Sequence, residues 1–173
     1  PLTHTKGFNP RPSVSIALPL SLGVSSCCEL LDFELDGCEI PYNEIVQLLN
    51  ENLISGVVVR DVYTQGRKLR DLSLLRCFVI LEYDNGVPSG AKQSIEELFN
   101  RSAVVVPKKT KNGIQEQDII PMIHRLEICQ TDENTLQIDA LICCQNPTLN
   151  PMQLIAAVEK YMPELVPDHV RYS

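Results

Sequence analysis

The pattern of apolar and polar positions divides the chain into two halves. In the first half it predicts strands over residues 13–20 and 31–35, a helix that begins at Pro41, and a strand over 57–63. In the second half it predicts a strand, a helix, a β-hairpin, two strands, a helix and a final strand. These segments are residues 74–83, 89–100, 103–120, 124–130, 136–144, 151–162 and 166–172.

The ends of the two halves resemble each other, which indicates an internal repeat. In each, a proline precedes an apolar helix and a strand then ends in tyrosine, from Pro41 to Tyr63 and from Pro151 to Tyr172. Without the hairpin, the second half reads strand, helix, strand, strand, helix, strand, which is the ferredoxin-like βαββαβ order. The first half has the same order without the opening strand and helix, so we expect that an N-terminal piece is absent from this chain.

The sequence therefore predicts an α+β fold of tandem ferredoxin-like (βαββαβ) units. A partial unit spans residues 1–64 and lacks its opening strand and helix. A polar linker over 65–73 connects it to a second unit over 74–173, into which the hairpin 103–120 is inserted.

Composition indicates a broad class of protein but no chemistry. The 173 residues are 44% hydrophobic and 21% charged, which is typical of a folded, soluble domain. The net charge of −7 argues against a dedicated binder of duplex DNA, whose binding domain is normally basic. No apolar stretch approaches the roughly 20 residues of a membrane span, and no signal-peptide core follows Pro1. We therefore expect a cytoplasmic protein that does not contact a membrane.

The seven cysteines favour buried thiols over a metal site. Their number is odd, and the two adjacent pairs, Cys27–Cys28 and Cys143–Cys144, occur without any Cys-x-x-Cys motif. In the alternative arrangement, one member of each pair meets Cys38 in space and the three thiols hold a metal ion. We expect free thiols in a reducing compartment, and neither a metal nor a cofactor.

Charge is unevenly distributed along the chain. Residues 27–59 contain seven acidic and no basic side chains, whereas residues 60–125 carry a net charge of +3. Lys108, Lys109 and Lys111 gather at the tip of the predicted hairpin. They indicate either a local patch that binds a polyanion such as RNA, or a solvated tip that protects a strand edge from aggregation.

The most distinctive string is Gly7-Phe8-Asn9-Pro10-Arg11-Pro12. Its two prolines restrict the backbone and remove two amide donors, and its glycine permits a close approach of the backbone. Such a stiff loop can hold Lys6, Asn9 and Arg11 toward a phosphate or carboxylate, which a guanidinium binds through two parallel hydrogen bonds. The alternative is a structural crossover loop in which Phe8 fills the core.

No candidate catalytic arrangement emerges from the sequence. His4, His124 and His169 are scattered, and no Gly-rich phosphate loop follows a predicted strand. His4 near the opening loop would suit the base of a metal-independent RNA hydrolase, but a surface histidine without such a role is the simpler interpretation. We expect that the chain is not a complete enzyme.

The opening string and several later segments resemble the radical-SAM-linked protein family. This is a bacterial family of uncharacterised domains adjacent to, or fused with, a radical SAM enzyme that has a cobalamin-binding-type region. The later matching segments are Ser15–Leu20, Leu22–Val24, Leu31–Leu35, Lys108–Lys111 with Gly113, and Asp118–Pro121. The resemblance covers nearly the whole chain, but the family's N-terminal stretch, with its Ser-His-Leu-Asp-like motif and helix, has no counterpart here.

The resemblance implies a cytoplasmic accessory protein whose partner, a radical SAM enzyme, performs the chemistry. Tandem ferredoxin-like units also occur in CRISPR repeat-cleaving endoribonucleases, which is an analogy of fold alone. Together with the basic hairpin, these similarities predict that the chain binds RNA or another anionic substrate. The predicted binding residues are Lys6, Asn9, Arg11, Lys108, Lys109 and Lys111. The alternative is a module that docks the radical SAM enzyme through the acidic segment 29–51 and contacts no nucleic acid.

Overall fold

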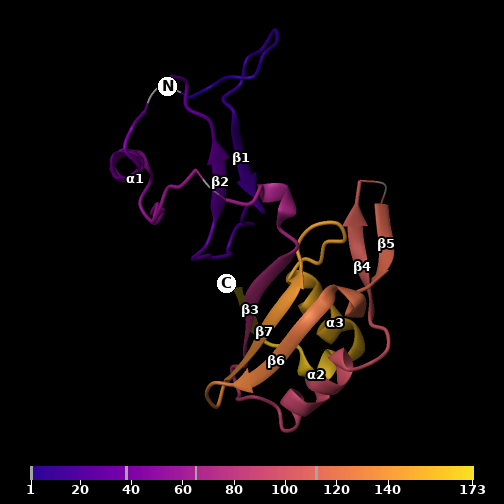
Figure 1. Cartoon of the computed structure of the whole chain (residues 1–173). Coiled ribbons are helices and arrows are strands. Elements are labelled where there is room, and N and C mark those ends of the chain that lie inside the picture. The colour runs from indigo at the N-terminus through magenta and orange to yellow at the C-terminus, as the bar shows by residue number, and fades with distance from the viewer. Residues whose placement is uncertain (1, 38, 65, 112) are drawn as a thin grey trace. The chain divides into compact units, whose positions relative to one another are not determined.

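The computed structural model describes residues 2–37, 39–64, 66–111 and 113–173, and within them the chain has an α+β architecture with antiparallel sheets. It divides into two compact units (Figure 1). Unit 1 consists of Pro1–Ala17 and Glu29–Asp71, and unit 2 consists of Leu18–Cys28 and Leu72–Ser173. The division after Asp71 falls inside the segment 65–73. Residues 18–28 group with unit 2, although they lie in the first half of the sequence.

Unit 2 is built on a four-stranded antiparallel sheet in the spatial order β6-β7-β3-β8. The strands are β3 (Leu74–Glu82), β6 (Ile123–Gln130), β7 (Thr135–Cys143) and β8 (His169–Tyr172). The central strands β3 and β7 are paired along their full length, from Leu74 opposite Cys143 to Glu82 opposite Thr135. β8 pairs with the other edge of β3, so the last strand of the chain closes the unit.

Two helices, α2 (Ala91–Phe99) and α3 (Met152–Tyr161), cover one face of this sheet (Figure 1). Alternate residues of β3 point toward the helices because successive strand side chains face opposite sides, and Val79 and Leu81 are fully buried. Ile95 of α2 and Leu154 of α3 are fully buried in the same core. The main hydrophobic core therefore lies between the helices and one face of the unit 2 sheet.

The inserted hairpin consists of β4 (Val105–Thr110) and β5 (Gly113–Asp118). The strands pair in register from Val105 opposite Asp118 to Thr110 opposite Gly113. Asn112, on which the predicted Asn-Gly turn depends, lies outside the described residues. The Asp118 carboxylate fixes the base of the hairpin, because one of its oxygens accepts hydrogen bonds from the amides of Val104 and Ile120 at 2.9 and 3.2 Å.

Unit 1 contains a two-stranded antiparallel sheet and one helix. β1 (Val14–Ala17) pairs with β2 (Leu30–Phe33), and α1 (Tyr42–Asn52) begins directly after Pro41. Proline suits this position because its fixed φ is compatible with a helix start and its missing amide removes no helical hydrogen bond. Among the described residues of unit 1, Ile45 is the only buried hydrophobic side chain, so this unit has almost no core.

The strand predicted over residues 57–63 is absent: these residues adopt no regular secondary structure. The Asn50 side chain instead holds the backbone of Val59, donating to its carbonyl at 3.0 Å and accepting from its amide at 2.7 Å. In unit 2 the corresponding segment is β8, which pairs with β3. No described strand of unit 1 occupies the place of β3, so residues 57–63 lack the neighbour that a β-ladder requires.

The face of the unit 2 sheet that points away from the helices carries a charged cluster. Asp139 on β7 accepts two hydrogen bonds from Arg76 on β3, at 3.0 and 2.6 Å, and one from Arg125 on β6 at 3.2 Å. The hydrogen bonds from Arg76, followed by the charges of both guanidinium groups, hold the pKa of Asp139 below its usual value. The cluster links three neighbouring strands on the face of the sheet that points away from α2 and α3.

In the described part of the chain, no helix is both long enough and apolar enough to cross a membrane.

Candidate anion-binding site

The opening loop, residues 5–11, is closed by hydrogen bonds between its two ends. The Thr5 amide donates to the Arg11 carbonyl at 2.8 Å, and the Arg11 amide donates to the Thr5 hydroxyl at 3.1 Å. One residue further out on each side, His4 forms an isolated antiparallel bridge with Pro12. In Figure 1 the loop is the indigo segment that extends beyond the β1–β2 pair. Sequence reasoning missed the role of Thr5, although a threonine beside a proline-rich turn is a recognisable loop-closing residue.

The predicted binding residues of this loop, Lys6, Asn9 and Arg11, are exposed, and so is Phe8. The Phe8 ring is fully exposed, at 101%, so the alternative in which it fills the core is wrong. Gly7 has a φ of +152°, and a Cβ added there would meet no atom within 4 Å. This positive φ favours glycine, and no described protein atom lies close enough to require it.

The three predicted lysines of the hairpin differ in environment. Lys108 is half-buried, and its ammonium group donates to the Thr148 carbonyl at 3.1 Å. Lys109 and Lys111 are exposed. The alternation follows from the strand, in which neighbouring side chains point to opposite faces. Lys108 thus contributes to holding the hairpin against the loop before α3, whereas Lys109 and Lys111 face solvent.

Helix α3 fixes the base of the hairpin through two residues that sequence reasoning missed. Lys160 donates to the Val105 carbonyl at 2.9 Å and forms an ion pair with Glu116 at 3.2 Å. The Tyr161 hydroxyl donates to the same carbonyl at 3.1 Å and lies 3.2 Å from the Val105 amide, which donates to it. These contacts join residues far apart in sequence, so no local pattern indicates them.

The structure groups the six predicted site residues by unit. Lys6, Asn9 and Arg11 come together in one loop of unit 1, and the three lysines come together in the hairpin of unit 2. None of the five cations forms an ion pair with a described residue. Their charges are therefore unneutralised by the described protein, and both segments can attract an anion.

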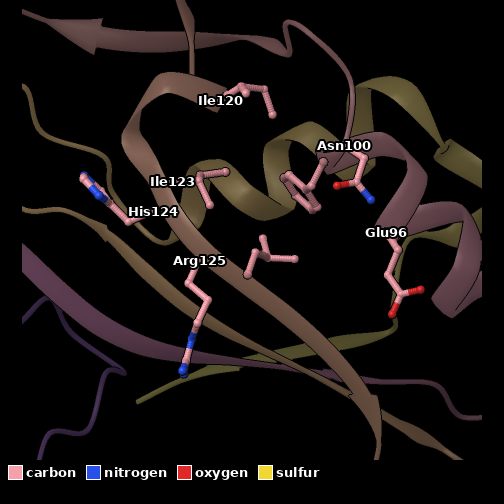
Figure 2. Close-up of a pocket in the computed structure, with 8 residues that line it drawn as sticks. Glu96, Asn100, Ile120, Ile123, His124 and Arg125 are labelled. Atoms are coloured by element: carbon pink, nitrogen blue, oxygen red, sulfur yellow. The ribbon is translucent and has the colours of Figure 1, made fainter.

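A shallow pocket lies between α2 and the start of β6, but its polar side chains do not converge. Figure 2 shows Ile123 between the two elements, with His124 and Arg125 extending away from Glu96. Arg125 reaches Asp139 on the face of the sheet that points away from the helices. The pocket therefore lacks the facing acid and base that catalysis requires.

The structure brings one histidine close to a thiol. His124 Nε2 lies 3.5 Å from Cys143 Sγ, a pairing that the sequence did not indicate. Cys77 and Cys144 are buried, as expected of core thiols, and burial raises the pKa of Cys77 to about 11. Cys27, Cys28 and Cys129 are exposed, so the prediction of buried thiols is wrong for these three.

No group of three or more His, Cys, Asp or Glu side chains in the described part of the chain is placed to hold a metal ion. Cys38, which the alternative metal arrangement requires, lies outside the described residues.

A family model described as an uncharacterized protein conserved in bacteria (DUF2344) matches residues 1–151. No curated protein and no solved structure matches the chain.

Proposed function

The chain belongs to DUF2344, a family of uncharacterised proteins conserved in bacteria, and on that premise we propose that it is a cytoplasmic RNA-binding accessory protein. In this proposal the opening loop and the hairpin bind the RNA, and a radical SAM enzyme performs the chemistry. The enzyme partner rests on the resemblance of Gly7–Pro12 and the later segments to radical-SAM-linked proteins. The chain itself is proposed to bind and position the substrate without catalysing a reaction.

We also infer that both units derive from the ferredoxin-like unit. Unit 2 supports this inference with its strand–helix–strand–strand–helix–strand order, interrupted by the hairpin, and with the spatial order β6-β7-β3-β8. Unit 1 supports it with the order strand, strand, helix, in which the elements corresponding to β3, α2 and β8 are missing from the described structure.

The observation that carries the RNA proposal is the full exposure of Phe8 between two free cations. A phenylalanine ring in water stabilises nothing in the fold, whereas it can stack on an unpaired base. Lys6 and Arg11 lie on either side of it in a loop whose ends are hydrogen-bonded to each other. The ring would hold a base while the two cations contact the flanking phosphates, and the Asn9 amide would reach the edge of the base.

The hairpin supplies the second set of contacts. Lys109 and Lys111 are exposed and unpaired by any described acid, and they would follow the backbone of a single strand. The ammonium of Lys108 uses one N–H on the Thr148 carbonyl, and an ammonium has three donors. It can therefore bind phosphate without releasing its structural contact.

Removing the Phe8 ring tests the proposal. In Phe8→Ala, affinity for a single-stranded RNA is expected to fall by roughly 5- to 150-fold, because stacking one base is worth roughly 1–3 kcal/mol. Phe8→Tyr should retain the affinity. Binding to heparin, a polyanion without bases, should not change, and fluorescence anisotropy measures both ligands.

Leu22→Ala is the matched control, because Leu22 is as exposed as Phe8, at 104%, and lies outside the loop. Equal losses of RNA affinity in Phe8→Ala and Leu22→Ala would contradict a stacking role for Phe8. An unchanged RNA affinity in Phe8→Ala would contradict it as well.

A second candidate function, protein docking, is favoured by a separate observation. The seven acidic side chains of residues 29–59 form no ion pair with a described residue. In the same unit, Val14, Ile16 and Leu31 leave large apolar areas exposed. Exposed apolar surface bordered by charge is typical of a protein-binding surface.

A further inference from the structure

We propose that Cys143 is a nucleophilic thiol with His124 as its base, and that it is a site of reversible modification by low-molecular-weight disulfides. The proposal rests on the placement of these two side chains in unit 2. It goes beyond RNA binding, and it depends neither on that function nor on protein docking.

An irregularity in the unit 2 sheet aims His124 at the thiol. The register of β6 against β7 shifts between Ile123 and Arg125, so His124 is an extra residue outside the regular ladder. Such a bulge redirects a side chain from the usual alternation of a strand. Figure 2 shows the His124 ring pointing away from Ile123. Its Nε2 atom lies 3.5 Å from Cys143 Sγ.

Cys143 is held in place at the end of β7. Its carbonyl accepts a hydrogen bond from the Leu149 amide at 2.9 Å, and the amide of the next residue, Cys144, donates to the Ser73 carbonyl at 3.0 Å. The Cys143 side chain is half-buried and points to the opposite side of the strand from the fully buried Ile142. The thiol is therefore fixed beside the imidazole and is still reachable by a small molecule.

Proton transfer between the two side chains supplies the reactive form of the thiol. The thiolate is the nucleophile, and a neutral imidazole within hydrogen-bond reach can take the proton of the thiol. After the transfer, the imidazolium N–H donates to the thiolate. The contact between His124 and Cys143 therefore has the geometry of a base and its nucleophile.

The reaction is a thiol–disulfide exchange. As the thiol proton moves to Nε2 of His124, the Cys143 sulfur attacks one sulfur of the small disulfide. A new S–S bond forms to Cys143 and the S–S bond of the small disulfide breaks. The leaving thiolate takes the proton from the imidazolium, so the products are a mixed disulfide and a small thiol. The Cys143 sulfur is oxidised and the leaving sulfur is reduced, and an excess of small thiol reverses the step.

The other described cysteines lack this arrangement. Cys77 and Cys144 are buried, and burial raises the pKa of Cys77 to about 11 and the pKa of Cys144 above its ordinary value. Buried thiols of this kind are inert. Three further thiols are exposed, but no hydrogen bond joins them to a described residue; these are Cys27, Cys28 and Cys129. Exposure alone predicts that these three react first, whereas the proposal predicts that Cys143 does.

The unmodified full chain gives the first test. It is exposed to bis(2-hydroxyethyl) disulfide, which is small and uncharged, and quenched with acid, and peptide mass spectrometry measures the modified fraction of each cysteine over time. Cys143 is expected to react at least about tenfold faster than the more exposed Cys129, because a positioned base contributes roughly a hundredfold or more and partial burial offsets part of this gain. Equal rates, or a faster reaction at Cys129, would overturn the proposal.

The variant His124→Gln tests the role of the imidazole, because glutamine is polar but is not a base. The rate at Cys143 should fall about tenfold or more, to the rate at Cys129 or below. A merely structural role of His124 predicts the opposite, since a loosened strand end exposes the thiol and raises its rate. His169→Gln, the same change at an exposed histidine of β8, should leave the rate unchanged. An unchanged rate in His124→Gln, or equal effects of the two variants, would overturn the proposal.

Discussion

Reversing four exposed cations together, in the variant Lys6→Glu/Arg11→Glu/Lys109→Glu/Lys111→Glu, is expected to lower the affinity for single-stranded RNA on the order of several thousandfold at about 50 mM salt. The estimate follows from counterion release, in which each phosphate contact on a single strand changes log K by about 0.7 per decade of salt. Relative to about 1 M salt, each contact then raises the RNA affinity nearly tenfold at about 50 mM salt. Electrophoretic mobility shift with a labelled single strand measures the loss.

Lys108 is left unchanged in this variant because its bond to the Thr148 carbonyl belongs to the packing of the hairpin. The matched control is Arg60→Glu/Arg67→Glu/Lys68→Glu/Lys92→Glu, which changes the net charge by the same amount at other exposed positions. A similar loss in both variants would show that RNA responds only to net charge, which would contradict binding by the loop and hairpin.

The second large expected effect is a loss of stability when a side chain in the core of unit 2 is shortened. Leu81→Ala should lower the free energy of unfolding by about 3–4 kcal/mol, because the side chain is fully buried and its loss leaves a cavity. Leu31→Ala, the same change on the exposed face of unit 1, should cost less than about 1 kcal/mol. Urea denaturation followed by circular dichroism measures both. Similar costs for the two variants would contradict the assignment of the core to unit 2 alone.

The elements of unit 2 could be predicted from sequence because their patterns and their partners lie within the same unit. The apolar spacing of residues 89–100 and 151–162 predicted helices, and α2 and α3 form within those ranges. In unit 1 the same reasoning failed for residues 57–63. Their β-branched pattern is typical of a strand, but a strand forms only beside a neighbour, and no described strand is there to pair with it.

The candidate site shows the same dependence on long-range contacts. The sequence could select the opening loop and the lysines of the hairpin from charge and proline content. It could not separate Lys108 from Lys109, because the difference depends on Thr148, which is distant in sequence. It also left the position of Phe8 open, since a phenylalanine in a loop is compatible with either a core plug or an exposed ring.

The salt dependence of RNA binding by the unmodified full chain tests the central claim most directly. With five cations on phosphates, the affinity for a single strand is expected to fall about a hundredfold between about 50 and 200 mM salt. A titration at these two concentrations with a labelled, unstructured RNA measures it. A fall of this size is the result we predict. No binding at the lower salt concentration, or an affinity that does not change with salt, would contradict the claim that the opening loop and the hairpin bind RNA.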